Sequence, residues 1–502
     1  MTTSFITTAI PFVNARPHLG FAYELVLSDV LARHRRHRGR DVRFVTGTDD
    51  NSLKNVDAAA REGISPRALV DRNAAAFRAL GPLLNLSPDD FVGTSTDPRH
   101  PIAVDWLWRA CAASGDFYRR TWFGWYCAGC EGFVDDEVTV CAEHGVAPEP
   151  VEEENWFFRL SRWRAPVRDA IATGRLQILP DAARAETLAF LDREVRDLSV
   201  SRIASRSAGW GIPVPDDPGQ TIYVWFDALT NYLTTLGLGA PGSAALVDRF
   251  WRAPGERVHV IGKGITRFHA VYWPAFLLSA GLPLPDRILV HGYLTVDGEK
   301  ISKSKGTDEA YQRRVEVPPV VERVGVDALR WYFVRRCRTR NDADISIDAI
   351  AATHDEDLAD GLGNLVQRST TLGARLSARV TRPTIESGPA ARLRALGEAL
   401  PARIDRAVDQ FLLDDAAAAI VELIDAANRY LEETAPWRLA RTDHGAAAAA
   451  LFAPLEAARV AVHEIAPFVP GVAATIAARL GEPGAVLGAA PPPLPRLRNG
   501  RG

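Results

Sequence analysis

The chain has 502 residues, of which 47% are hydrophobic and 24% are charged. That composition is ordinary for a soluble globular protein, and the length allows two to four domains. Lys and Arg number 59 against 62 Asp and Glu, which leaves a net charge of -3. The overall charge therefore does not indicate a dedicated nucleic-acid-binding protein, although local basic patches are compatible with it. No run of about 18 apolar residues and no signal-peptide pattern occurs, so we expect a cytoplasmic protein with no membrane partner.

The N-terminal stretch predicts the start of a parallel α/β fold. Residues 5–10 are short, apolar and β-branched, as in a buried strand, and a turn containing Asn14 and Pro17 follows. His18 opens a periodic helical segment, and residues 41–47 form the next expected strand. This strand–helix–strand order favours a doubly wound parallel sheet.

Polar residues follow both of these expected strands. His18 and Gly20 open the helix, where backbone donors and the helix dipole favour an anion, and Gly20 allows a phosphate to approach the backbone closely. Asp49 follows the second strand, at the edge where open α/β sheets bind ligands, and it is placed to bind an ammonium group. The alternatives are that His18 lies in an ordinary surface turn and that Asp49 caps a helix.

Four potential metal ligands come in two close pairs. Cys127 and Cys130 form a Cys-x-x-Cys, and Cys141 and His144 form a Cys-x-x-His. Thiolates and imidazole favour Zn²⁺, and four protein ligands predict a structural ion rather than a catalytic one. In a reducing compartment such a cluster also suits a metal better than disulfides. The alternative is that these cysteines bind no metal.

Later stretches are expected to return to the sheet. Residues 221–229 are predicted as an aromatic-rich strand that runs into a helix, and residues 258–264 and 288–292 as two further strands. Residues 265–278 have apolar and aromatic residues at helical spacing. The aromatic residues in these stretches are by themselves more typical of a core than of a ligand pocket; they are Trp225, Tyr232, Phe268 and Trp273.

A short loop between Gly298 and Gly306 is rich in lysine and hydroxyl groups. It contains Lys300, Ser302, Lys303, Ser304 and Lys305. Such a loop can bring several donors onto a polyphosphate. The alternative is a basic loop that is simply solvated.

The remainder of the chain, from Val326, predicts an all-α bundle of four or five helices. Apolar residues recur at three- and four-residue spacing over residues 355–376, 390–412, 414–431 and 451–480. The tail from Pro491 is rich in proline and arginine, and we expect it to be disordered.

Taken together, these motifs resemble the methionyl-tRNA synthetase family of class I aminoacyl-tRNA synthetases, over nearly the whole chain. His18-Leu19-Gly20 and the run from Lys300 to Ser304 are similar to the two signature motifs of that class, HIGH and KMSKS. The two cysteine-containing pairs match the family's zinc knuckle. Further matches come in the family's order at residues 47–49, 154–160, 197–202, 210–213, 223–229, 261–263, 268–270 and 363–368.

The resemblance implies an α/β Rossmann-type catalytic domain with a zinc-bearing connective insertion, followed by an all-α anticodon-binding-like helical bundle. The expected parts are the first half of the Rossmann domain (1–115), the insertion (116–205), the second half (206–298), the KMSKS loop and stem (299–350), the helical domain (351–482) and a disordered tail (483–502). No further dimerisation domain follows the bundle, so we expect a monomer.

The resemblance also implies roles for individual residues in ATP-dependent activation of methionine and its transfer to tRNA. His18, Lys300 and Lys303 would be catalytic and would bind ATP together with Gly20, Gly262 and Ser302, with Mg²⁺ offsetting phosphate charge. Asp49 would bind the amino group of methionine or a related amino acid. The side-chain pocket would comprise Ile10, Phe12, Trp225, Ala228, Leu229, Tyr232, Ile265, His269 and Trp273. The anticodon would be read by Asn364, Arg368 and Trp437, and a structural Zn²⁺ would be bound by Cys127, Cys130, Cys141 and His144.

Several departures from the family pattern fall on the catalytic face. Phe21 stands in place of the second histidine of the HIGH motif, and Asp50-Asn51-Ser52 replace the family's Glu-His-Gly. Gly264 replaces an aspartate that contacts the ATP ribose in the family, and Phe12 replaces a pocket tyrosine. Losing one preorganised donor typically costs about 10²–10³ in rate.

Three hypotheses follow from this pattern. The first is a methionyl-tRNA synthetase with altered activity. The second is a tRNA-independent ligase paralogue that adenylates an amino acid and passes it to a small-molecule acceptor. The third is a non-catalytic tRNA-binding protein. The retained Asn364, Arg368 and Trp437 favour a protein that still binds tRNA.

Overall fold

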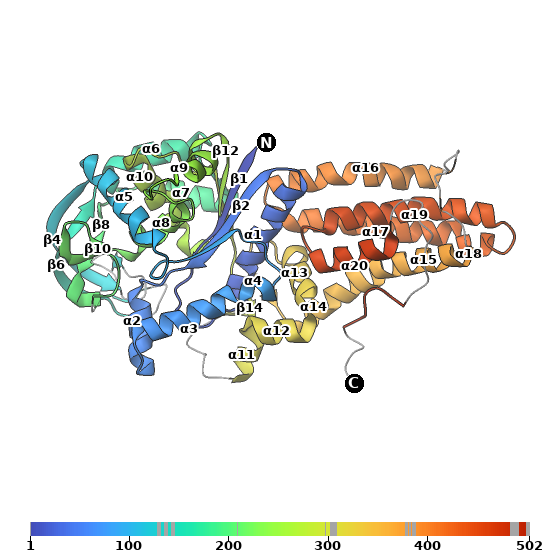
Figure 1. Ribbon diagram of the computed structural model, residues 1–502, viewed down its shortest axis with the longest axis horizontal. Coiled ribbons are helices and arrows are strands. Elements are labelled where there is room, and N and C mark those ends of the chain that lie inside the picture. The colour runs from blue at the N-terminus through green and yellow to red at the C-terminus, as the bar shows by residue number, and fades with distance from the viewer. Residues whose placement is uncertain are drawn as a thin grey trace. The chain divides into compact units, whose positions relative to one another are not determined.

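The structure is a computed structural model in which the described residues form two compact units (Figure 1). They are residues 2–127, 132–134, 139–141, 146–207, 209–296, 298–301, 309–376, 380, 383, 388–481 and 491–497, with the backbone alone described at 132–134, 207, 299 and 300. The first unit comprises Met1–Pro82 and Leu86–His291, and the second comprises Leu83–Asn85 and Gly292–Gly502.

A six-stranded sheet forms the centre of the first unit. Its order is β3-β2-β1-β12-β13-β7, and every pair is parallel. The central strand β1 is buried from Ser4 onward, as its apolar and β-branched sequence predicts. The strands are β1 (Thr3–Thr8), β2 (Asp41–Thr48), β3 (Asp90–Gly93), β7 (Gln177–Leu179), β12 (Gly255–Gly262) and β13 (Arg287–His291). The predicted parallel α/β sheet is confirmed.

Helices connect these strands and cover the sheet. A large apolar core includes Phe5 of β1, Leu107, Phe226 and Phe276. The helices and helical turns are α1 (Leu19–His37), α2 (Leu53–Glu62), α3 (Pro66–Arg78), α4 (Leu80–Leu83), α5 (Arg99–Ala113), α6 (Leu160–Ala172), α7 (Asp181–Asp192), α8 (Val224–Thr234), α9 (Ala244–Val247), η2 (Asp248–Arg252), η3 (Lys263–Ile265), η4 (Phe268–Tyr272) and α10 (Trp273–Ser279).

Two small antiparallel sheets complete the first unit. One has the order β5-β4-β6-β8, and its long ribbon pairs β4 (Phe117–Cys127) with β6 (Glu149–Phe158). The other has the order β10-β11-β9. The remaining bounds are β5 (Gly132–Val134), β8 (Leu198–Ser199), β9 (Ser201–Ile203), η1 (Ala204–Ser207), β10 (Pro213–Val214) and β11 (Asp217–Ile222).

Two predictions about the first unit are wrong. The strand expected at 221–229 ends at Ile222 and belongs to an antiparallel sheet, and helix α8 begins at Val224. The β-branched and aromatic residues of this segment have a local preference for a strand, but packing in the tertiary structure stabilises a helix from Val224 onward. Residues 116–205 are not wholly an insertion either, because β7 pairs with β13 in the parallel sheet. A strand that short has no recognisable periodicity.

The second unit is mainly a helical bundle. A small sheet of order β15-β14-β16 comes first, and the long helices α16, α17 and α19 then run side by side (Figure 1). The strands are β14 (Leu294–Val296), β15 (Glu299–Lys300) and β16 (Ala343–Ile345). The helices are α11 (Glu309–Val315), α12 (Val317–Val324), α13 (Val326–Arg335), α14 (Ile347–Thr353), η6 (His354–Gly363), α15 (Asn364–Leu376), α16 (Gly388–Asp409), α17 (Leu413–Thr434), α18 (Pro436–Leu439), α19 (His444–Ile465) and α20 (Pro470–Leu480).

Helix α19 is, within the described part of the chain, the one helix long and apolar enough to cross a membrane by length and composition. It packs against α15, α16, α17, α18 and α20. Its apolar character is thus accounted for by its place inside the bundle, as in the core helix of a soluble protein.

Two details of the predicted bundle differ in the structure. The helix expected over 451–480 is two helices, because Pro467 and Pro470 interrupt the backbone hydrogen bonds between α19 and α20. The tail is not disordered at residues 491–497. There the Leu497 backbone N–H donates to Asp355 at 2.7 Å, and Arg496 forms an ion pair with Asp360 at 2.7 Å. Acidic residues of η6, Asp355 and Asp360, bind the basic tail. The composition of the tail alone does not reveal these partners.

Candidate active site

The site is built at the carboxyl ends of β1 and β2, which are neighbours in the sheet. The segments that follow them also lie side by side, since Phe12 and Asp49 form a parallel bridge and the Asp49 backbone N–H donates to the Pro11 carbonyl at 2.9 Å. Open parallel sheets bind ligands at this edge. The predicted sites at His18 and Asp49 therefore belong to one edge of one sheet.

His18 is the N-cap residue of α1. Its Nδ1 accepts a hydrogen bond from the Gly20 backbone N–H at 3.1 Å, so the neutral ring carries its proton on Nε2. A Cβ at Gly20 would lie 3.0 Å from Cε1 of the imidazole, so a side chain there would displace the ring. The result is an imidazole N–H donor beside a helix N-terminus, which suits an anion.

Asp49 is not a helix cap. The residue that caps α2 is Ser52, whose side chain accepts from the Lys54 backbone N–H at 3.1 Å. Asp49 is instead 1% exposed, and its carbonyl accepts a hydrogen bond from the Asn55 side chain at 3.1 Å. A buried carboxyl at the ligand edge of the sheet has the chemistry to bind a cationic group.

Aromatic side chains from three segments converge next to this edge. Trp225 of α8 stacks on Phe268 with ring centroids 3.6 Å apart and an interplanar angle of 4°. Phe12 meets Trp225 edge-on at 6.2 Å, and His269 lies 6.3 Å from Trp225. Tyr232 completes the group, since its hydroxyl is 2.7 Å from Nε2 of His269. The structure thus brings together aromatic residues that the sequence alone favours as core.

The polar groups in this pocket are held in neutral forms. Burial lowers the pKa of His269 to about 4, and Nδ1 of the ring lies 3.0 Å from the Ile265 carbonyl. Nδ1 therefore carries the proton and Nε2 accepts from Tyr232, whose pKa burial raises well above its ordinary value. The aromatic group offers polarisable rings, with one cation at its edge, the Lys54 ammonium 4.8 Å from the centroid of Phe12. Such rings suit an apolar or thioether side chain.

The other predicted pocket residues lie on α8 or on neighbouring segments. Tyr232 is 5.9 Å from Trp273, and Ala228 and Leu229 are buried on α8. Ile265 ends η3, and Ile10 is the second residue after β1. No contact that we describe links Ile10 to the aromatic group.

The expected nucleotide site is described in part. Gly262 ends β12, and a Cβ there would lie 3.6 Å from the His291 ring. His291 Nε2 is 3.1 Å from Glu24, whose other oxygen accepts from the Ala9 backbone N–H at 2.8 Å. Lys300 lies in β15 with only its backbone described, and Ser302 and Lys303 lie outside the described residues.

Half of the expected zinc site is described. Cys127 ends β4, and Cys141 lies in the described stretch 139–141. Both side chains are buried, and neither forms a disulfide. Cys130 and His144 lie outside the described residues.

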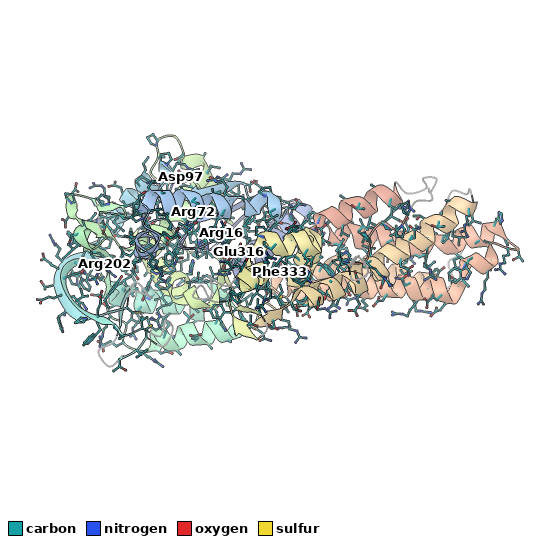
Figure 2. The ribbon with its side chains drawn as sticks, turned by 90° about the horizontal axis from the view of Figure 1, so that it is seen from below. Arg16, Arg72, Asp97, Arg202, Glu316 and Phe333 are labelled. Atoms are coloured by element: carbon teal, nitrogen blue, oxygen red, sulfur yellow. The ribbon has the colours of Figure 1, made fainter. Side chains whose placement is uncertain are left out.

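A buried arginine lies between these cysteines and the pocket helix. This residue, Arg202, is labelled in Figure 2. Its guanidinium lies over the ring of Tyr223, the N-cap residue of α8, at 4.5 Å, and over Tyr126 at 5.6 Å. It donates to the Ser201 carbonyl at 2.7 Å. Arg202 therefore connects the last residues of β4 to the start of α8.

Two of the three expected anticodon residues are in contact in the second unit. The Arg368 guanidinium lies 4.9 Å from the ring of Trp437, which is 39% exposed, and 3.7 Å from Glu432. Asn364 is exposed at the start of α15, one turn before Arg368, so both lie on one face of that helix. An exposed aromatic ring with a cation on it is suited to stacking with an unpaired base.

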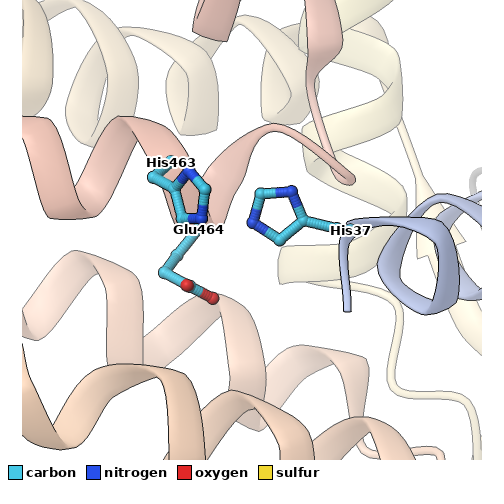
Figure 3. Close-up of side chains that lie close together, drawn as sticks. All are labelled: His37, His463 and Glu464. Atoms are coloured by element: carbon cyan, nitrogen blue, oxygen red, sulfur yellow. The ribbon is translucent and has the colours of Figure 1, made fainter. Parts of the chain in front are cut away.

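A further group of potential metal ligands is divided between the units. His37 belongs to α1 of the first unit, and His463 and Glu464 belong to α19 of the second (Figure 3). Because the group draws on both units, we assign no metal site to it.

Sequence reasoning missed several residues that support the site. Phe268 was not placed in the pocket, and Asn51, Asp227 and His100 were not recognised as a buried network. The hydrophobic pattern carried no signal for these polar partners, because they are far apart in the sequence.

Family models match nearly the whole chain. The model described as tRNA synthetases class I (M) matches residues 4–143 and 137–370, and that of the anticodon binding domain of methionyl tRNA ligase matches residues 387–487. A methionine--tRNA ligase of Brucella suis is 40% identical over 474 residues, which cover 93% of this chain and 89% of that protein. One from Mesorhizobium japonicum is 39% identical and covers 95% and 91%.

Solved structures agree with this assignment. A Mycobacterium tuberculosis methionyl-tRNA synthetase in complex with methionyl-adenylate matches with a TM-score of 0.90 and 36% identity, over 99% of this chain and 100% of that one. The apo form of the M. tuberculosis enzyme matches with a TM-score of 0.84 and 34% identity, over 99% and 98%. With these matches over both units, the chain belongs to the methionyl-tRNA synthetase family of class I aminoacyl-tRNA synthetases.

Proposed function

We propose that this protein activates methionine with ATP and transfers the methionyl group to tRNA. The observation that carries the proposal is the neutral aromatic pocket beside the buried Asp49, in a chain whose relatives are named methionine--tRNA ligases. In the first step a methionine carboxylate oxygen attacks the α-phosphate of ATP and pyrophosphate leaves. In the second step a terminal tRNA hydroxyl attacks the activated carbonyl and AMP leaves.

The phosphates would bind at the N-terminus of α1. His18 presents its Nε2–H there, and Gly20 leaves space beside the ring. We propose that Lys300, Ser302 and Lys303 add donors as negative charge develops on the phosphates. The protein has no need of a nucleophilic side chain, because catalysis of this kind rests on positioning and charge stabilisation. Mg²⁺, when bound with ATP, would supply further compensation of phosphate charge.

Methionine would be recognised at both ends. Asp49 would bind the ammonium group, and its burial would make that ion pair strong. The side chain would enter the pocket defined by Trp225, Phe268, Tyr232 and His269, where a thioether makes favourable contacts with aromatic rings. A charged side chain would be disfavoured next to Tyr232 and His269, because burial holds both groups neutral.

The tRNA anticodon would bind to the second unit. The arrangement of Arg368 over Trp437, with Asn364 on the same helix face as Arg368, supports stacking and hydrogen bonding to unpaired bases. Glu432 would have to release Arg368 for a contact with phosphate or base.

We also propose a structural Zn²⁺ bound by Cys127, Cys130, Cys141 and His144. In support, Cys127 and Cys141 are buried thiols without a disulfide, and the Cys141 backbone N–H donates to the Val146 carbonyl at 2.8 Å. The ion would fix the tip of the β4–β6 ribbon. Metal analysis of the purified protein tests this proposal: about one zinc per chain is expected, and a protein without zinc would exclude the site.

The test of function is amino-acid-dependent ATP–pyrophosphate exchange, with methionine and a panel of other amino acids. Methionine is expected to give the strongest exchange, followed by charging of tRNA. Exchange with another amino acid and no tRNA charging would instead indicate a ligase for a small-molecule acceptor. Absence of exchange, together with tRNA binding, would indicate a non-catalytic protein.

Light scattering and cell fractionation test our further proposals of a monomer and of a cytoplasmic location.

A further inference from the structure

A buried polar bridge joins the Asp49 loop to the pocket helix α8. Asn51 Nδ2 donates to Asp227 Oδ2 at 2.7 Å, and Asp227 is 1% exposed in the first turn of α8. Asn51 follows Asp49 by two residues, and Asp227 follows Trp225 by two residues. This hydrogen bond therefore links the loop that carries Asp49 to the helix that carries Trp225.

Asp227 is also held from the side opposite Asn51. Its Oδ1 is hydrogen-bonded to Nε2 of His100, which is fully buried in α5, and Nδ1 of His100 is 2.8 Å from the Thr234 hydroxyl. Each carboxylate oxygen of Asp227 thus has a side-chain partner from a different element. A buried carboxylate bonded on both oxygens has little freedom to rotate.

The Asp49 loop is fixed on its other sides by hydrogen bonds to its backbone. The Asp50 carbonyl accepts from the Asn55 side chain at 2.8 Å and from Trp210 Nε1 at 2.8 Å. These bonds attach the loop to α2 and to the segment before β10. Among the bonds described for the loop, Asn51 supplies the one from a side chain to α8, and its Nδ2 also lies 3.5 Å from the Thr94 carbonyl. Removing the Asn51 side chain would therefore free the loop relative to α8 and remove one long contact to Thr94.

We propose that Asn51, held through Asp227 and His100, is a positioning residue that sets the separation between Asp49 and the aromatic pocket, and hence the length of amino-acid side chain that is accepted. This inference rests on the proposed function, because it assigns the ammonium group to Asp49. An amino acid recognised at both ends is sensitive to the separation of the two sites, and displacements of about 1 Å are enough to cost catalytic efficiency.

The experiment measures ATP–pyrophosphate exchange by the full chain and by Asn51→Ala. The variant is expected to raise KM for methionine roughly 10- to 100-fold, which corresponds to loss of a hydrogen bond to a charged group, with KM for ATP within about twofold of the parent. The preference for methionine over its S-ethyl homologue is expected to decrease. Asn51→His keeps an N–H donor and is expected to stay within about threefold of the parent, which is a rescue that a loss of packing would not give.

Two further variants separate positioning from instability. Asn51→Ser, which is too short to reach Asp227, is expected to reproduce the KM shift if the alanine variant does not fold. Asn428→Ala in the second unit also removes a part-buried hydrogen bond, which the Asn428 side-chain amide donates to the Gly361 carbonyl at 3.1 Å. This variant is expected to lower the melting temperature without changing exchange kinetics.

The outcomes distinguish this inference from the function it rests on. No methionine-dependent exchange in the parent would overturn the proposed function and the positioning role together. An active parent with unchanged KM for methionine in Asn51→Ala and Asn51→Ser would overturn the positioning role alone. So would a parallel rise of KM for methionine and for ATP, since that would indicate general damage to the site.

Discussion

Acidification should destabilise the first unit through His269. This side chain is 1% exposed, its Nδ1 faces the Ile265 carbonyl, and its Nε2 accepts from the Tyr232 hydroxyl. The neutral ring satisfies both bonds, whereas a second proton would place an uncompensated charge in an apolar pocket. Burial accordingly lowers the pKa of His269 to about 4, from an ordinary value of 6.5.

The direction and size of the effect follow from linkage. Between pH 6.5 and pH 4 the unfolded chain binds a proton that folded His269 does not, so protons favour unfolding in that interval. The stability associated with the neutral ring is fully present above pH 6.5 and is lost as the pH falls toward 4. The loss for this one group amounts to about 2 kcal/mol at pH 5 and about 3 kcal/mol at pH 4, relative to neutral pH.

Urea unfolding of the parent and of His269→Gln measures this effect. The glutamine can still accept from Tyr232 but does not titrate, so other groups cancel in the difference between the two proteins. The transition that includes α8 can be identified from its amide hydrogen exchange. Between pH 7.5 and pH 5 the parent should lose about 2 kcal/mol more than the variant. An equal loss in both proteins would refute the reasoning that His269 is held neutral by burial.

Three further predictions concern other parts of the chain. Gly47→Ala should lower the melting temperature strongly, because a Cβ at this position would lie 2.2 Å from the Val92 carbonyl oxygen; calorimetry measures the shift. Trp437→Ala should weaken tRNA binding by roughly 10-fold while leaving ATP–pyrophosphate exchange unchanged, since it removes a stacking surface and the partner of Arg368; filter binding measures the affinity. Cys127→Ser should release the proposed zinc and weaken protection of the β4–β6 ribbon in hydrogen exchange.

The ligand edge of the sheet could be predicted from the sequence because its signals are local. His18 and Gly20 lie next to each other at a helix start, and Asp49 directly follows a strand. Local patterns also predicted the parallel strands β1, β2, β12 and β13 and the helical bundle. Where the prediction failed, as at α8, the local preference for a strand was real but was overridden by packing in the core.

The support of the site could not be predicted, because its partners are distant in the sequence. Asn51 meets Asp227 across 176 positions, and His100 meets the same carboxylate across 127. Neither periodicity nor spacing carries information about such pairs. Buried polar networks are determined by how elements pack, so they become visible only with the tertiary structure.

The departures at Phe21 and Gly264 have different physical meanings. Phe21 packs in a small apolar cluster with Val13 and Val70, and its ring is 5.2 Å from Phe77. Gly264 is exposed and lies in the helical turn η3. Phe21 is thus part of local packing, so Phe21→His would bring an imidazole against aromatic rings with a cost in stability. Gly264→Asp instead adds a carboxylate at an exposed position. If activity is limited by a missing ribose contact, Gly264→Asp alone should improve exchange, and an effect confined to KM for ATP would locate the change at the nucleotide.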